Sequence, residues 1–148
     1  MVAWCHGAPG IGLSRLRAWR HRRDEVLRDE IDVALETTVR EGFGRNHSLC
    51  HGDFGNIDVL LVASTTFGDD TWAQRANRLA GAALDSARET GWMCGNPLGV
   101  ESPGLMTGLA GIGYELLRLA AAERVPSVLA LEEPRYRATG NWALYRRP

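Results

Sequence analysis

The segment from Cys50 to Ala63 reads CHGDFGNIDVLLVA, a Gly-x-x-Gly turn that runs directly into an almost wholly apolar stretch. Glycine at such a turn permits positive φ and a close approach of the backbone. A helix that is apolar on most of its circumference is an inner helix, covered by others. The segment therefore predicts an inner helix that begins at a glycine turn.

The same phrase occurs three times along the chain. Cys5–Leu13 reads CHGAPGIGL and Gly108–Tyr114 reads GLAGIGY, so the first glycines of the three turns lie 45 and 56 residues apart. Each interval accommodates a pair of helices, and self-similarity on this scale is typical of helical-hairpin repeats. The chain is thus predicted to consist of helical hairpins, each opened by a glycine turn.

The segments between the turns have helical periodicity of another kind. Asp24–Glu41 and Asp69–Thr90 each carry one apolar stripe among charged residues, which predicts amphipathic outer helices. In the first of them the stripe consists of Leu27, Ile31, Ala34, Leu35 and Thr38. We expect an all-α fold, with Val128–Leu131 as one short extended piece and 133–148 as an irregular tail.

Composition narrows the possible functions of the 148 residues. All 17 basic residues are Arg, which excludes P-loop, protein-kinase and Schiff-base chemistry that needs a Lys. With a net charge of −1, the chain lacks the electrostatic attraction to phosphates that drives nucleic-acid binding. No apolar run approaches the roughly 18–20 residues that a membrane span needs. With no secretory signal visible at the N-terminus, we expect a cytoplasmic protein that binds no nucleic acid.

Two of the three cysteines occupy equivalent points of successive repeats. Cys5 and the pair Cys50-His51 each precede the first glycine of a turn, and equivalent turns of a helical array lie on one face. Two thiolates and an imidazole suit Zn²⁺, and three protein ligands leave the fourth tetrahedral position open. Two alternatives stay open: small buried cysteines with His51 as a turn residue, and a closed site completed by His6.

Longer motifs carry a specific resemblance. The phrases WCHGAPG (Trp4–Gly10), LCHGDFGN (Leu49–Asn56) and SPGLMTGLAGIGY (Ser102–Tyr114) resemble the last part of the lanthionine synthetase C-like cyclases. The closing phrase VPSVLALE (Val125–Glu132) is similar to the end of the cyclase domain in bifunctional class II lanthipeptide synthetases. The resemblance covers nearly the whole chain, from Trp4 to Glu132.

This resemblance implies an α/α toroid of inner and outer helices, of which residues 1–132 are the C-terminal and therefore incomplete portion. It implies Zn²⁺ held by Cys5, Cys50 and His51. The reaction implied is (methyl)lanthionine ring formation, in which a peptide cysteine thiolate adds to dehydroalanine or dehydrobutyrine. The partners implied are a dehydrated precursor peptide and the N-terminal remainder of a synthetase.

The family's general acid and base lie in motifs upstream of the first cysteine phrase, so the catalytic and substrate-binding residues stay unassigned. His6 or His47 could replace them in principle. We expect the chain alone to be inactive or weakly active. The alternatives are a non-catalytic helical-repeat module that binds zinc or peptides, and a toroidal glycosidase that would rely on paired carboxylates.

Overall fold

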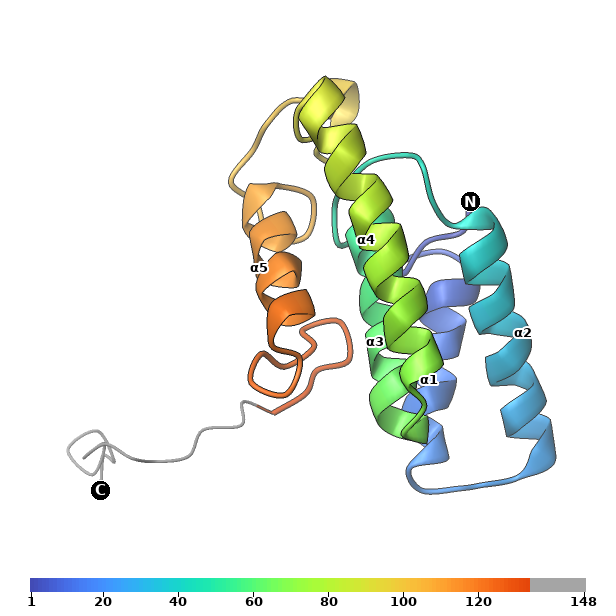
Figure 1. The fold of residues 1–148 in the computed structure, drawn as a ribbon. Coiled ribbons are helices and arrows are strands. Elements are labelled where there is room, and N and C mark those ends of the chain that lie inside the picture. The colour runs from blue at the N-terminus through green and yellow to red at the C-terminus, as the bar shows by residue number, and fades with distance from the viewer. Residues whose placement is uncertain (134–148) are drawn as a thin grey trace, which may run out of the picture.

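The computed structural model describes residues 1–133, which form five α-helices and one short 3-10 helix joined by turns and loops (Figure 1). Within this range there is no strand beyond an isolated bridge between Ala3 and His6, so the all-α prediction is confirmed. The predicted tail lies outside the described residues except for Glu133. The elements are α1 (Ala8–Trp19), α2 (Glu25–Glu41), α3 (Asp53–Phe67), α4 (Asp70–Thr90), the short 3-10 helix η1 (Pro97–Gly99) and α5 (Leu109–Ala120).

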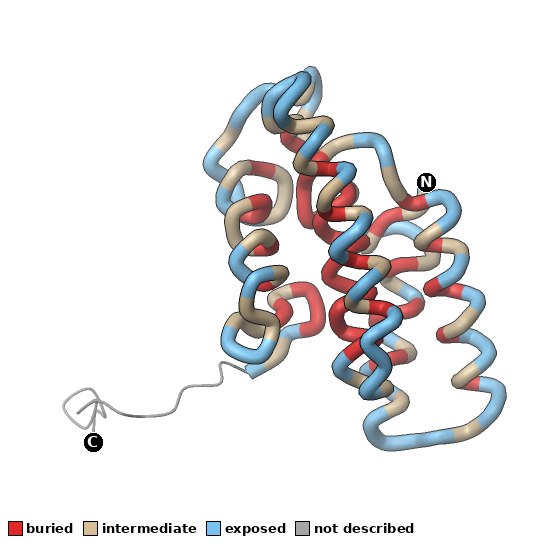
Figure 2. Tube along the Cα trace, in the orientation of Figure 1, coloured by how far each residue is buried: buried red, intermediate tan, exposed pale blue. Residues whose placement is uncertain are grey.

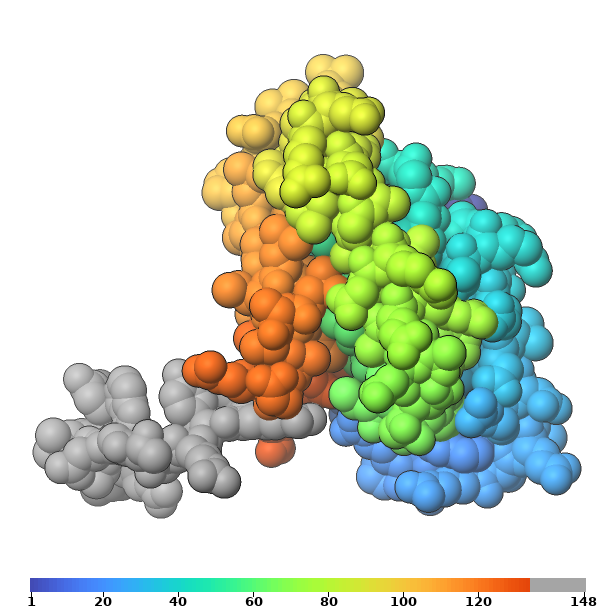
Figure 3. Space-filling view, viewed as in Figure 1, coloured from blue at the N-terminus to red at the C-terminus, as the bar shows by residue number. Residues whose placement is uncertain are grey.

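Helix α3 is the centre of the molecule. It packs against α1, α2, α4 and α5, and every residue from Asp53 to Ser64 is buried (Figure 2). In the space-filling view α4 and α5 cover most of it (Figure 3). The prediction of an inner helix after the Cys50-His51 turn is therefore confirmed.

The two amphipathic helices lie outside and begin close to the predicted positions. The buried residues of α2 are the five of the predicted stripe. Asp24 caps α2 by accepting a hydrogen bond from the Leu27 amide at 2.9 Å, and Asp69 caps α4 by accepting one from the Thr71 amide at 2.9 Å. Such caps stabilise a helix by about 1 kcal/mol. None of the helices within residues 1–133 combines the length and the apolar character needed to cross a bilayer.

The three glycine turns share one close backbone contact, although Gly7 has a positive φ of 107° and Gly52 and Gly108 are extended. In each, the first glycine is the N-cap of the following helix, and the second packs against the carbonyl group of the residue three positions before the first. A Cβ on the second glycine would overlap that carbonyl oxygen. The second glycines and the carbonyls are Gly10 with Trp4, Gly55 with Leu49, and Gly111 with Leu105.

Successive turns are joined by backbone hydrogen bonds. The Cys5 amide donates to the Cys50 carbonyl at 3.3 Å, and the Cys50 amide donates to the carbonyl of Met106, the equivalent residue of the third turn, at 2.8 Å. The three turns therefore lie side by side, at the N-terminal ends of α1, α3 and α5. Closure of this array into a toroid stays a prediction.

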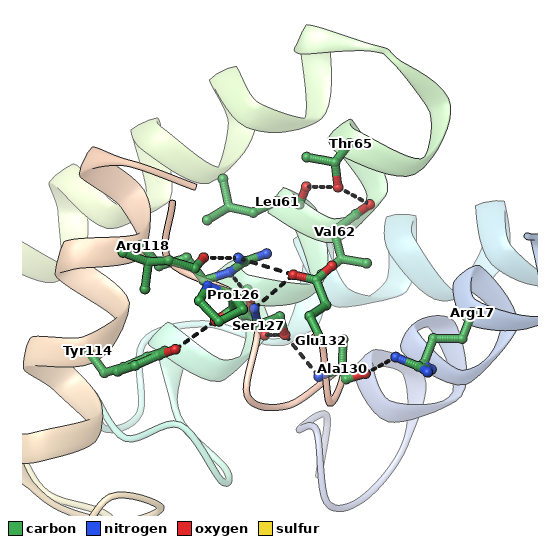
Figure 4. A network of polar contacts seen from close by, with 12 residues as sticks. Arg17, Leu61, Val62, Thr65, Tyr114, Arg118, Pro126, Ser127, Ala130 and Glu132 are labelled. Atoms are coloured by element: carbon green, nitrogen blue, oxygen red, sulfur yellow. Dashed lines mark hydrogen bonds and ion pairs between the residues drawn. The ribbon is translucent and has the colours of Figure 1, made fainter. Parts of the chain in front are cut away.

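The segment after α5 folds back onto α3 through a buried polar network (Figure 4). Arg118 of α5 donates to the carboxylate of Asp58 in α3 and to the Val125 carbonyl at 2.6 Å. Ser127 donates to the same carboxylate, and the Ala130 amide donates to the Ser127 hydroxyl at 2.9 Å. Burial raises the pKa of Asp58, and the charge of Arg118 offsets this in part.

The prediction of a short extended segment at Val128–Leu131 is wrong. These residues form a turn, and Leu131 has a positive φ of 51°. The physical reason is the Ser127 hydroxyl, which binds the Ala130 amide and so closes the turn locally. Within this turn, Leu129 and Ala130 are buried. The segment pairs with no strand in the described part of the chain.

Glu115 of α5 is buried, and its Oε1 has no hydrogen-bond partner among residues 1–133. Burial and the neighbouring Asp58 raise the pKa of Glu115 well above its usual value. The folded protein therefore holds the proton at pH values where the unfolded chain has released it, and stability falls as the pH rises above about 4.5.

We expect Glu115→Gln, which mimics the protonated acid, to match the wild type near pH 4 and to be more stable at pH 7. Chemical denaturation at a series of pH values measures the difference in free energy of unfolding. The exposed Glu89→Gln is the matched control and should show no such divergence. A Glu115→Gln curve parallel to the wild type at all pH values would contradict the burial of an uncharged acid.

Candidate metal centre

Cys5, Cys50 and His51 come together as the sequence predicted. Each offers one ligand atom, and the three atoms all lie within 4.8 Å of one another. A tetrahedral zinc ion with Zn–S bonds of about 2.3 Å and Zn–N bonds of about 2.0–2.1 Å needs ligand atoms about 3.5–3.8 Å apart. Small side-chain adjustments therefore suffice to close the group around an ion.

Two adjacent turns position these side chains. Cys5 precedes α1 and is exposed, whereas Cys50 and His51 directly precede α3 and are half-buried. Neighbours in a helix point in different directions. Cys50 and His51 reach the same site because they lie in the turn that ends at Gly52, the N-cap of α3. The amide end of α3 also lies next to the group, where its dipole favours negative charge.

The surroundings of Cys50 disfavour its ionisation. Burial, together with the hydrogen bond and the charge of Cys5, raises the pKa of Cys50 to about 11. A divalent cation reverses this effect, because it stabilises the thiolate over the thiol. Two thiols and an imidazole are thus a donor set that fits Zn²⁺ in chemistry as well as in spacing.

His6 lies beside this group without joining it. Its Nδ1 is 3.3 Å from the Cys5 sulfur, yet within residues 1–133 the group contains no fourth Cys, His, Asp or Glu. The alternative of a closed site completed by His6 is therefore not supported. The remaining cysteine, Cys94, is buried in the core as a free thiol.

His47 is a buried structural residue. Its backbone amide donates to the Met93 carbonyl at 2.8 Å, and its Nδ1 accepts from the Met93 amide at 2.9 Å. The ring packs edge-on against Trp92 with centroids 5.4 Å apart, and burial lowers the pKa of His47. His47 therefore holds the segment that begins at Met93 next to the site through this pair of hydrogen bonds. A role for His47 as a proton carrier is not supported.

A cleft of about 530 Å³ lies next to His51. Arg45, Asn46 and the segment from Met93 to Gly99 line it together with the imidazole. Sequence reasoning missed this segment as part of the site, because it lies about 45 residues after the ligands and outside the repeats. Its only local signal is the turn composition of Gly95-Asn96-Pro97.

The sequence model of the family described as lanthionine synthetase C-like protein matches residues 1–130. The chain belongs to this family. One relative, the lacticin 481/lactococcin biosynthesis protein LcnDR2 of Lactococcus lactis subsp. lactis, is 32% identical over an alignment of 130 residues that covers 78% of this chain. The matched part is 14% of that relative's length, so the chain spans a small part of it. The resemblance of the cysteine and glycine motifs is thereby confirmed.

Proposed function

We propose that this chain is the zinc-binding part of a lanthipeptide cyclase of the bifunctional, class II type. The reaction joins a cysteine of a dehydrated precursor peptide to a dehydroalanine or dehydrobutyrine in the same peptide. The observation that carries this proposal is the convergence of Cys5, Cys50 and His51 from two repeats of a lanthionine synthetase C-like chain. The similarity to a lacticin biosynthesis protein supports the peptide substrate.

In the proposed site, Cys5, Cys50 and His51 would hold Zn²⁺, and the ion would supply Lewis-acid activation of the substrate thiol. When bound, zinc favours the thiolate form of a thiol at neutral pH. The addition is balanced without any oxidant or reductant. A C–S bond forms at the β-carbon, the C=C double bond becomes single, and a proton equivalent to that lost by the thiol is added at the α-carbon.

The cleft beside His51 supports a role in holding the peptide. Arg45 and Asn46 bring hydrogen-bond donors to its wall, and a peptide segment next to the metal site offers carbonyl acceptors to them. The half-buried position of Cys50 and His51 keeps the site open to such a substrate. Substrate-binding residues beyond this cleft belong to the remainder of a synthetase in this proposal, and the isolated chain is expected to form rings slowly or not at all.

Zinc content is the direct test. We expect the purified wild type to hold about one zinc per chain, and Cys50→Ala to lose most of it, because two remaining ligands bind zinc weakly. Cys94→Ala removes the third, buried cysteine and is the matched control that should keep its zinc. Elemental analysis with a protein assay measures the ratio, and unchanged zinc in Cys50→Ala would refute the three-ligand site.

Cobalt substitution separates a cyclase site from a structural zinc site. With three protein ligands, a small thiol added to the Co²⁺-loaded protein should enter the open position and change the thiolate-to-cobalt absorption. A spectrum that does not respond to added thiol would show four protein ligands. That result would favour the non-catalytic zinc- or peptide-binding module.

A further inference from the structure

The imidazole of His51 packs directly against the backbone of Gly95. A Cβ added at Gly95 would lie 2.8 Å from Nε2 and 3.0 Å from Cε1 of His51, and it would overlap the hydroxyl of Ser48. Real Cβ atoms do not approach other atoms this closely, so only glycine leaves room for the ring in this position. The Nε2 edge of His51 therefore faces a wall made of Gly95 and Ser48.

The Ser48 hydroxyl is available to that ring nitrogen. Ser48 is fully buried, and its Oγ has no hydrogen-bond partner in the described part of the chain. A buried hydroxyl without a partner is unfavourable, because it has given up its hydrogen bonds to water. Its Oγ and the His51 Nε2 both adjoin the space where the Gly95 side chain is missing, so this unused acceptor lies close to a ring nitrogen.

Three sets of hydrogen bonds hold this wall in place. The Gly95 amide donates to the Thr107 carbonyl at 2.7 Å, which ties it to the third glycine turn. Two residues earlier, Met93 forms the paired hydrogen bonds with His47 described above. The Ser48 amide donates to the Asn46 side chain at 3.0 Å. These hydrogen bonds fix the position of the backbone that packs against the His51 ring.

We propose that Ser48 and Gly95 are positioning residues for His51. Gly95 leaves room for the imidazole, and the Ser48 hydroxyl accepts a hydrogen bond from Nε2–H when the ring is held by the metal. Nδ1 is then the nitrogen directed at zinc, because the wall occupies the Nε2 side. A ligating histidine commonly donates its second N–H to such a partner, which fixes the tautomer and raises the affinity for the metal. This inference rests on the proposed zinc site.

Two variants test the proposal with readouts other than catalysis. In Ser48→Ala we expect zinc affinity, measured by competition with a chelator, to fall about 10–100-fold. The metal-free Ser48→Ala protein should be as stable as the wild type or more so, because the hydroxyl it loses has no partner there. In Gly95→Ala the new methyl displaces the ring, and zinc affinity should fall at least as far.

The matched controls are Ser14→Ala, at an exposed hydroxyl far along the chain from Ser48, and Gly81→Ala, where a Cβ meets nothing within 4 Å. Both should keep wild-type zinc affinity. Histidine ¹⁵N spectra of the zinc-loaded wild type should show Nδ1 of His51 bound to metal and Nε2 protonated. If Gly95→Ala does not fold, Ser48→Ala and the spectrum decide alone.

Zinc on Nε2 overturns the proposal, as does Ser48→Ala with unchanged zinc affinity. So does a Ser48→Ala protein that loses stability without metal, which would assign the hydroxyl a structural role. These outcomes leave the three-ligand site intact. A wild type without zinc, or a Cys50→Ala variant that keeps it, overturns the site and this inference together.

Discussion

Arg118→Ala is expected to lower the free energy of unfolding by about 3–5 kcal/mol. The side chains of Arg118 and Asp58 are both only 1% exposed, and Asp58 lies on the central helix α3. Removal of the cation leaves a buried carboxylate whose remaining hydrogen-bond partner among residues 1–133 is the Ser127 hydroxyl. Domains of this size are stable by about 5–15 kcal/mol, so the loss is a large fraction of the total.

Denaturant unfolding followed by circular dichroism measures this loss. Arg88→Ala is the matched control, because Arg88 pairs with Asp85 at the surface with side chains 77% and 69% exposed. An exposed pair contributes about 0–1 kcal/mol. Similar losses in the two variants would contradict the buried network.

The double variant Arg118→Met with Asp58→Leu distinguishes a lost ion pair from a lost packing contact. Because the two side chains are joined directly, their substitutions are not additive. We expect the double variant to be more stable than Arg118→Met alone, since it leaves no buried carboxylate without its cation at Asp58. Additive losses would show that the pair itself contributes nothing.

Gly55→Ala is expected to cost more than about 4 kcal/mol, the range in which single substitutions break a specific structural feature. The new Cβ would overlap the carbonyl carbon and oxygen of Leu49. Both are backbone atoms, so no side-chain rotation relieves the contact. The displaced segment directly precedes Cys50 and His51, and we therefore expect zinc binding to be lost as well.

Gly81→Ala is the matched control for this prediction. Gly81 lies within α4, where an added Cβ meets nothing within 4 Å. Alanine there should raise the free energy of unfolding by up to about 1 kcal/mol, the usual gain over glycine inside a helix. Thermal unfolding of the three proteins compares them directly. If Gly55→Ala were as stable as the wild type, the backbone at Leu49 would have to move away from residue 55 at little cost, and the prediction would be wrong.

Both predictions concern how the metal centre is held. The glycine turns bring Cys5 and Cys50 side by side, since the close backbone approach at each turn sets where the preceding residues lie. The buried network joins α5 and the following segment to α3, whose first residue adjoins the site. A change in either region therefore acts on the site through the position of α3.

The helices and the three residues that converge at the site could be predicted from the sequence, because the signals are local. The stripe of α2 and the caps Asp24 and Asp69 depend on residues a few positions apart, where periodicity and capping operate. The repeated turns likewise mark Cys5 and Cys50 as equivalent positions. The amino-acid order alone thus determined the all-α class, the inner and outer helices and the convergence of the cysteines with His51.

Only the tertiary structure decided the polar contacts between distant segments. Asp58 lies in an apolar run and Arg118 in an amphipathic helix, 60 residues apart, and nothing local marks them as partners. The same holds for His47, whose partner Met93 is 46 residues away, and for Gly95 beside His51. Such pairs form because packing brings two buried polar groups within reach of each other, and burial then requires them to bond.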